Sequence, residues 1–337
     1  MKERLLGCIP SYVQEEEARR MGVKSDRELV EQMATPWNAT DQPRIIEWDK
    51  TWEEYLKAEA ETRDALRFAG QFPTPWEMCE RFFGMTFADL VGTIQKRNDC
   101  AAWATTRAAV VMSLIQRWFG AERDPVAYNP TGIYAFSSGT KPKAGTRFTD
   151  NGRTIYGICK AACDTGNFPV DVLGLYDGGT SFTEKMILSM AVAMENQTGF
   201  AYVSDRGADR KVDIITLSLR SGRPVVIGND IALRDGCRKD SNGMWITDVG
   251  GGWGGGHATA AIDYRKVGDT EYIYIVNSHG NIYNSGTSIP AFGAYITKAG
   301  LKRYLSGSFS DIMPVTYTER PLGKENFNLN PEGAWNG

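Results

Sequence analysis

A cysteine followed by an alanine-rich run is the first feature of this sequence that could do covalent chemistry. Cys100 comes directly after Asn98 and Asp99 and opens the apolar stretch 101–115. Asparagine or aspartate before such a stretch is a typical helix N-cap, so the thiol is expected at a helix N-terminus. The helix dipole and the unpaired N–H groups there favour the thiolate, which is the nucleophilic form of cysteine.

A nucleophilic cysteine needs a base, and the sequence contains only two histidines, His257 and His279. His257 follows the glycine-rich run 250–256, which lets neighbouring backbone and side chains approach closely. His279 lies in a turn and is expected there as a turn or shielding residue. His257 is therefore the candidate base.

An asparagine is the candidate partner of that base. The stretches 258–264 and 272–276 each predict a strand, and Asn277 follows the second directly. If the two strands form a hairpin, the amide oxygen of Asn277 can accept a proton from one imidazole nitrogen of His257. The other nitrogen would then face Cys100.

Simpler interpretations exist for these residues. A lone buried cysteine is more often inert than catalytic, and the glycine-rich run could be only a flexible loop. A phosphate-binding loop is not expected because neither a lysine nor a helix follows the glycines. Cys159 and Cys163 are four apart in an expected helix, where they could form a metal pair. Core packing is the favoured interpretation, and no metal or cofactor is expected.

Three segments together resemble the papain-like cysteine peptidase family, in particular its divergent bacterial and phage-like members. Cys-Ala-Ala-Trp-Ala at 100–104 is similar to the nucleophile segment of the family. Gly-Gly-His-Ala at 255–258 resembles the start of the strand that carries the base. Asn-Ser-His-Gly at 277–280 resembles an Asn-Ser-Trp-Gly turn. The resemblance runs from about Gln95 to Leu305 in the order of the family.

The resemblance implies a role for each residue. Cys100 would be the nucleophile, His257 the base, and Asn277 the residue that orients the base. Gln95 would bind the oxyanion together with the backbone N–H of Cys100. Gln95 lies five residues before Cys100, one fewer than is usual in the family, and a solvent-facing role is the alternative. Asp99 adjoins the thiol, where a carboxylate opposes thiolate formation.

The order of the expected elements predicts an α+β fold. Helices are expected at 100–119, 152–165 and 182–197, and strands follow from about residue 225, so helices and strands are segregated along the chain. The resemblance implies a two-lobed fold, in which a helical lobe is followed by an antiparallel β-barrel-like lobe. The predicted divisions are an N-terminal helical extension at 1–94, the helical lobe at 95–200, the β lobe at 201–308 and a C-terminal tail at 309–337.

The composition limits the partners. The chain has 337 residues, a net charge of −3 and no long basic run, so nucleic-acid binding is not expected. No uninterrupted apolar stretch is long enough for a membrane span, and no membrane partner is expected. The segment 1–8 is too short in apolar length for a secretory signal, so the expected location is cytoplasmic or virion-associated. Six widely spaced cysteines without a signal argue against a disulfide framework.

Three functions remain open. The first is a papain-like endopeptidase that acts on a peptide or protein substrate. The second is a structural protein of a phage particle that has this fold, with weak or no peptidase activity. Residues 1–94 would then dock on other subunits of a large assembly. The third is a cell-wall amidase, which activity on peptidoglycan would distinguish from a peptidase.

Overall fold

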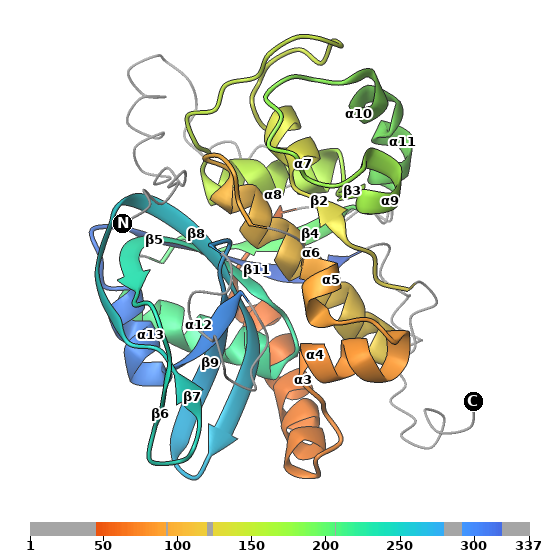
Figure 1. The fold of residues 1–337 in the computed structure, drawn as a ribbon. Coiled ribbons are helices and arrows are strands. Elements are labelled where there is room, and N and C mark those ends of the chain that lie inside the picture. Colours follow the sequence, from red (N-terminus) through yellow and green to blue (C-terminus); the bar gives the residue numbers. More distant parts are fainter. Residues whose placement is uncertain (1–44, 92–93, 120–123, 206, 280–291, 319–337) are drawn as a thin grey trace.

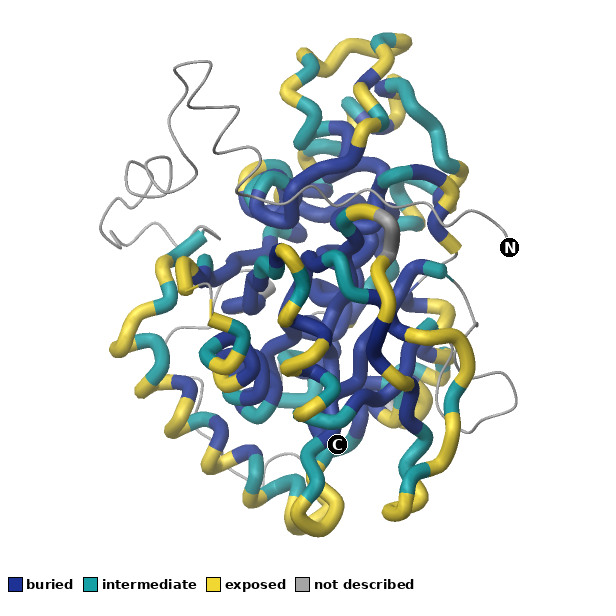
Figure 2. The backbone as a smooth tube through the Cα atoms, turned by 90° about the vertical axis from the view of Figure 1, so that its left-hand side faces the viewer, coloured by how far each residue is buried: buried dark blue, intermediate teal, exposed yellow. Residues whose placement is uncertain are grey.

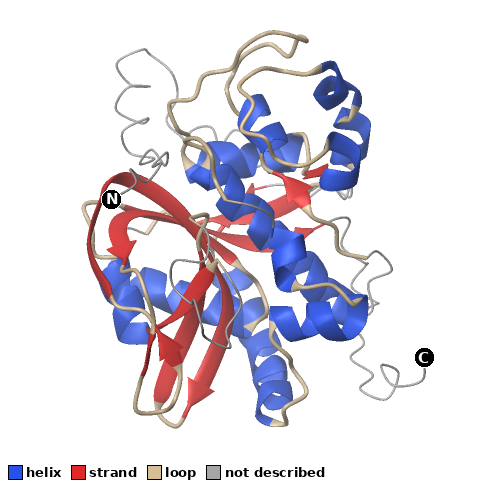
Figure 3. Ribbon diagram, viewed as in Figure 1, coloured by secondary structure: helices blue, strands red, loops and turns tan. Residues whose placement is uncertain are grey.

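A single nine-stranded sheet forms the centre of the protein (Figure 3). The computed structural model describes residues 45–91, 94–119, 124–205, 207–279 and 292–318. The strands of the sheet are β1 (Ile45–Glu47), β4 (Thr198–Tyr202), β5 (Val225–Leu233), β6 (Arg238–Lys239), β7 (Trp245–Ile246), β8 (Val249–Val267), β9 (Thr270–Val276), β10 (Gly293–Thr297) and β11 (Ser310–Thr318). A second, two-stranded sheet pairs β2 (Tyr128–Asn129) with β3 (Phe168–Pro169).

The strand order of the large sheet is β1-β4-β11-β5-β8-β9-β10-β7-β6. Neighbours from β4 to β10 pair antiparallel, whereas β1 with β4 and β7 with β10 pair parallel. In this order β1 and β6 lie at opposite edges. The described strands therefore form an open sheet, which does not confirm the antiparallel β-barrel-like lobe that the resemblance implies.

Helices cover both faces of this sheet (Figure 1). They are α3 (Lys50–Phe68), α4 (Pro75–Met78), the π-helical turn η1 (Cys79–Phe83), α5 (Phe87–Val91), α6 (Cys100–Trp118), α7 (Thr131–Phe136), α8 (Ile155–Asp164), α9 (Val170–Leu173), α10 (Glu184–Leu188), α11 (Met190–Met194), α12 (Ala208–Arg220) and α13 (Lys298–Tyr304). The fold is therefore α+β, as the sequence predicts. No helix among the described residues could cross a membrane.

Successive side chains of β9 divide between two apolar cores. Tyr272 and Tyr274 belong to the core that contains α6, while Ile273 and Ile275 belong to the core under α12 and α13. Because side chains of a strand alternate between the faces of a sheet, a continuous apolar run fits a strand that is covered on both sides. Figure 2 shows this buried centre, with the exposed positions confined to the periphery.

The long helix α6 matches the predicted range 100–119 closely. All its residues from Cys100 through Ile115 are buried, and the many alanines let α6 lie close to the sheet. Figure 1 shows α6 between the upper helices, α7 to α11, and the sheet below. The helix therefore carries its first residue, Cys100, into the interior of the molecule.

Two predicted features differ from the structure. The expected helix at 182–197 is two short helices, α10 and α11, which meet at Ser189. The sequence also suggests no strand beyond residue 308, yet β11 lies between β4 and β5 inside the sheet. Residues 1–44, which are slightly less than half of the predicted extension, and residues 319–337, which are most of the predicted tail, lie outside the described residues. The predicted domain divisions stay predictions.

Candidate active site

The candidate nucleophile lies at a helix N-terminus, as the sequence predicts. Cys100 is the first residue of α6 and is fully buried. Asp99 occupies the N-cap position, but its side chain makes no capping hydrogen bond to the helix. The carboxylate therefore does not satisfy the first N–H groups of α6, and the partial positive charge of the helix end remains available to the sulfur.

The other described cysteines are poor candidates. Burial raises the pKa of the Cys79 thiol to about 12 and that of Cys237 to about 11. Burial also raises the pKa values of Cys159 and Cys163, and Cys163 donates to the carbonyl of Thr198 at 3.0 Å. These last two are fully enclosed helix residues, as core packing requires. No group of three or more metal-binding side chains occurs among the described residues.

The candidate base and its partner are in contact. The Nε2 atom of His257 lies 2.8 Å from the Oδ1 atom of Asn277, and both residues are buried. An amide oxygen can only accept a hydrogen bond, so this contact requires the proton on Nε2. The Nδ1 atom of His257 is then the nitrogen that can take up a proton.

A hairpin brings these two residues together. Strands β8 and β9 pair antiparallel with Ala260 opposite Val276, which confirms the predicted hairpin. Asn277 follows Val276 directly, and His257 lies three residues before Ala260 in β8. Both side chains therefore lie at the open end of the hairpin, where diagonal neighbours on antiparallel strands come within reach of long side chains.

The segment that carries Asn277 is held against the helix of the candidate nucleophile. Arg107 lies seven residues after Cys100, and so about two helical turns further along the same face of α6. Its Nη1 atom donates to the backbone carbonyl of Asn277, and its Nε atom donates to the carbonyl of Val91 at 3.0 Å. Helical side chains tilt toward the N-terminus, so the guanidinium group extends back toward Cys100. Burial lowers the pKa of Arg107 to about 9.

The segment before the candidate nucleophile contacts the residue after Asn277. The backbone N–H of Gln95 donates to the carbonyl of Ser278 at 3.0 Å, and the Ser278 hydroxyl donates to Oε1 of Gln95 at 2.5 Å. Gln95 precedes Cys100 in the sequence and Arg107 follows it, and both residues contact the segment 277–278. Cys100 also shares an apolar core with Ala258, the residue after His257.

Hydrogen bonds hold the side chain of Gln95 in one orientation. Its Nε2 atom donates to the carbonyl of Arg97 at 2.5 Å, while its oxygen accepts from Ser278. An amide nitrogen is a donor, so this side chain carries the type of group that an oxyanion requires. Gln95 is 6% exposed, and a solvent-facing role does not describe it.

His279 stacks on the candidate base. The ring centroids of His257 and His279 are 4.5 Å apart, and the planes are inclined by 25°. His279 is half-buried, while His257 is fully enclosed. This stacking agrees with the expectation that His279 is a shielding residue of the turn, because it covers one face of the imidazole.

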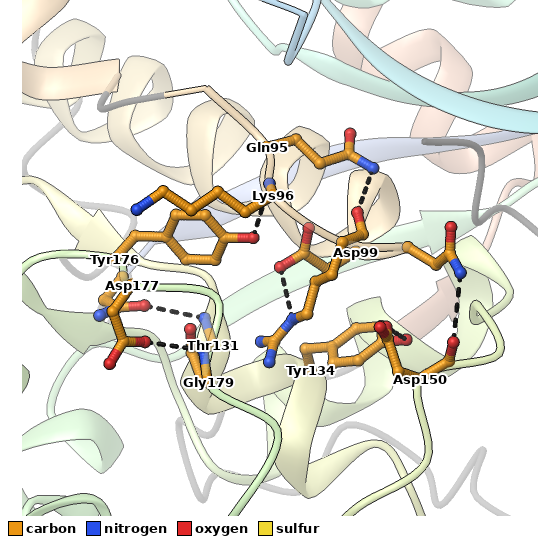
Figure 4. A network of polar contacts seen from close by, with 12 residues as sticks. Gln95, Lys96, Asp99, Thr131, Tyr134, Asp150, Tyr176, Asp177 and Gly179 are labelled. Carbon is orange, nitrogen blue, oxygen red and sulfur yellow. Dashed lines mark hydrogen bonds and ion pairs between the residues drawn. The ribbon is translucent and has the colours of Figure 1, made fainter. Parts of the chain in front are cut away.

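A buried ion pair lies directly before Cys100 (Figure 4). The Nε atom of Arg97 donates to Asp99 at 2.9 Å, and the guanidinium carbon lies 4.8 Å from the ring centroid of Tyr134 and 5.1 Å from that of Phe148. The hydroxyl of Tyr176 accepts the N–H of residue 96 at 2.9 Å. Burial raises the pKa of the Asp99 carboxyl to about 6, and the neighbouring Arg97 opposes this shift.

Comparison with known proteins gives cysteine proteases as structural neighbours. No family profile and no curated protein matches the chain. Xylellain, a cysteine protease from Xylella fastidiosa, is similar over 69% of this chain and 84% of its own, at 14% identity and a TM-score of 0.48. Digestive procathepsin L 3 of Tenebrio molitor is similar over 79% and 90%, at 10% identity and a TM-score of 0.41. The function has to be judged from the residues of the site.

The structure therefore brings together two of the predicted site residues, since His257 contacts Asn277. A third, Gln95, contacts Ser278, the residue after Asn277. Sequence reasoning missed Arg107 and Ser278 as residues that position the site. A signal for Arg107 existed, since a single arginine in the apolar stretch 101–115 must find buried hydrogen-bond acceptors.

Proposed function

We propose that this chain is a papain-like cysteine peptidase with a two-lobed arrangement and a Cys100, His257 and Asn277 triad. The observation that carries the proposal is the contact between His257 and Asn277. The segment 277–278 also contacts Gln95, which precedes Cys100 in the sequence, and Arg107, which follows it. The substrate would be a peptide or a protein. Cysteine chemistry of this kind requires neither a metal nor a cofactor.

The proposed reaction follows from the donors and acceptors of the site. The Cys100 sulfur, as thiolate, forms a bond to the carbonyl carbon of the substrate, while an N–H of Gln95 and the N–H of Cys100 stabilise the oxyanion. His257 has taken up the thiol proton on Nδ1; it then passes this proton to the leaving amine, and the C–N bond breaks. A water molecule gives a proton to His257 and attacks the thioester, which releases the acid and restores the Cys100 thiolate beside the protonated His257. Asn277 holds the imidazole in the required tautomer throughout.

A second function is favoured by the complete burial of the site. Cys100 and His257 are both 0% exposed, so a substrate can reach the sulfur only if neighbouring groups move. A protein that keeps this fold with weak or no peptidase activity needs no such movement. The sequence-based alternative of a structural component in a large assembly, such as a phage particle, is of this kind.

Thiol labelling distinguishes the two functions. The intact protein is treated with iodoacetamide near neutral pH, and the modified cysteines are located by mass spectrometry. For a peptidase we expect rapid modification of Cys100, which slows by roughly tenfold or more in His257→Ala because the imidazolium no longer stabilises the thiolate. The partly exposed Cys237 is an internal control for simple access. Labelling of Cys100 that is no faster than that of Cys237 would favour the inactive structural protein.

A further inference from the structure

A basic pocket lies where α13 meets the first residues of β8 and the end of β10. Figure 1 shows where these elements lie in the fold. Its volume is about 450 Å³, which is in the range of small-molecule sites. The lining residues are Arg234, Arg238, Ile246, Thr247, Asp248, Val249, Thr297, Ala299, Gly300 and Arg303. Three arginines against one aspartate leave two positive charges in this pocket.

Two of the arginines converge over one glycine. A methyl group placed on Gly250 would lie 3.2 Å from the Nη2 atom of Arg303 and 3.6 Å from the Nη2 atom of Arg234. The two nitrogens are therefore no more than about 7 Å apart, with nothing larger than a hydrogen atom on Gly250 below them. A single small ligand can contact both guanidinium groups at that separation.

Asp248, the acidic residue of the pocket, does not neutralise Arg234 and Arg303. Asp248 forms its ion pair with Arg238, at 3.0 Å. Within the described ranges no carboxylate lies within ion-pair distance of Arg234 or Arg303. The chain as a whole is not basic, since its net charge is −3. Arg234 and Arg303 are both exposed. Two like charges that lie close together without a counter-charge favour the binding of an anion.

We propose that this pocket binds a small oxyanion with two negative charges, which Arg234 and Arg303 hold between them. Guanidinium groups present planar pairs of N–H donors that match the oxygens of phosphate and carboxylate groups. A phosphate group and a small dicarboxylate share this chemistry. The site is independent of the proposed peptidase activity, since none of its residues contacts the candidate triad in any described interaction.

Calorimetric titration of the full chain tests the proposal. Inorganic phosphate and succinate are titrated separately at low ionic strength, and we expect saturable binding of one equivalent of at least one of them. Arg234→Gln and Arg303→Gln should each weaken that binding by roughly tenfold or more, because each removes a charged donor. The double variant Arg238→Gln/Asp248→Asn is the matched control, since it removes the ion pair of the pocket without changing its net charge, and it should change the affinity by less than about threefold.

The two anions distinguish the source of the ligand. Binding of phosphate alone assigns a phosphate group, and binding of succinate alone assigns a dicarboxylate. If Arg303→Gln does not fold, Arg303→Lys replaces it; this variant keeps the charge but loses the paired donors, and it should still bind more weakly. The proposal is overturned if neither anion shows saturable binding, or if the substitutions at positions 234 and 303 leave the affinity unchanged.

Discussion

Replacing Asp99 with asparagine should change the way in which the stability of the fold depends on pH. The Asp99 carboxyl is fully buried, and burial raises its pKa from 3.8 to about 6 despite the ion pair with Arg97. An asparagine has nearly the same shape and keeps an oxygen that can accept the hydrogen bond from Arg97. It has no charge to bury, so the comparison isolates the ionisation of one carboxyl.

The sign and size of this effect follow from the linkage between proton binding and folding. A carboxyl with a raised pKa in the folded state binds more protons there than in the unfolded chain between pH 3.8 and about 6. Its contribution to stability is fully present below pH 3.8 and is lost as the pH rises through about 6. A shift of about two pKa units corresponds to roughly 3 kcal/mol. Between pH 4 and pH 7, the free energy of unfolding of Asp99→Asn should therefore rise by about 3 kcal/mol relative to that of the wild type.

Urea unfolding at a series of pH values between 4 and 7.5 measures this difference. The free energies of unfolding of wild type and Asp99→Asn should differ least near pH 4, where both side chains are neutral, and diverge by pH 7. Asp164→Asn is the matched control, because its side chain is 50% exposed in a surface pair with Lys160. Its curve should follow the wild type within about 1 kcal/mol.

Parallel curves for wild type and Asp99→Asn would refute this reasoning. Asp99 would then stay ionised across the whole range at no cost, which means that Arg97 compensates its burial fully. A carboxylate would in that case adjoin the candidate nucleophile at every working pH. Divergence in the expected direction would instead mean that the residue before Cys100 loses its charge in mildly acidic solution.

Three further substitutions test how the site is held. Arg107→Met leaves the carbonyls of Val91 and Asn277 buried without their donor, and should lower the free energy of urea unfolding by roughly 2–6 kcal/mol. Gly293→Ala would place a methyl group 2.5 Å from the carbonyl oxygen of Ile275, and should lower the melting temperature by several degrees. Asn277→Ala should leave the fold intact but slow iodoacetamide labelling of the candidate nucleophile by roughly tenfold, as the imidazole loses its orienting acceptor. Unchanged stability in the first two variants, or unchanged labelling in the third, would contradict these expectations.

Local pattern was sufficient to predict the elements that carry the site. The helix beginning at Cys100 has a cap residue and a long apolar run, and the structure has it at Cys100–Trp118. The strands at 258–264 and 272–276 are apolar and separated by a short polar turn, so their pairing as a hairpin is also predictable. Both features depend on residues that are near each other in the sequence.

The parts that escaped prediction depend on distant residues or on breaks in a pattern. Strand β11 contains Pro314, which usually marks a strand end, and its partners β4 and β5 lie about a hundred residues earlier. The contacts of Arg107 with Asn277 and of Gln95 with Ser278 join residues 170 and 183 positions apart. No local periodicity encodes such contacts, because they arise only when the helix packs on the hairpin.

The way in which the segment 277–278 is held bears on the choice between an active and an inactive protein. Two of its contacts, from Arg107 and from the N–H of Gln95, are made to backbone carbonyls. A backbone acceptor remains whatever side chain occupies the position, so the segment can keep its place after the chemistry of Asn277 is lost. The fold alone is therefore compatible with either function. In the proposed triad the reactivity of Cys100 depends instead on the side-chain contact between His257 and Asn277, and measurements of thiol reactivity test that dependence.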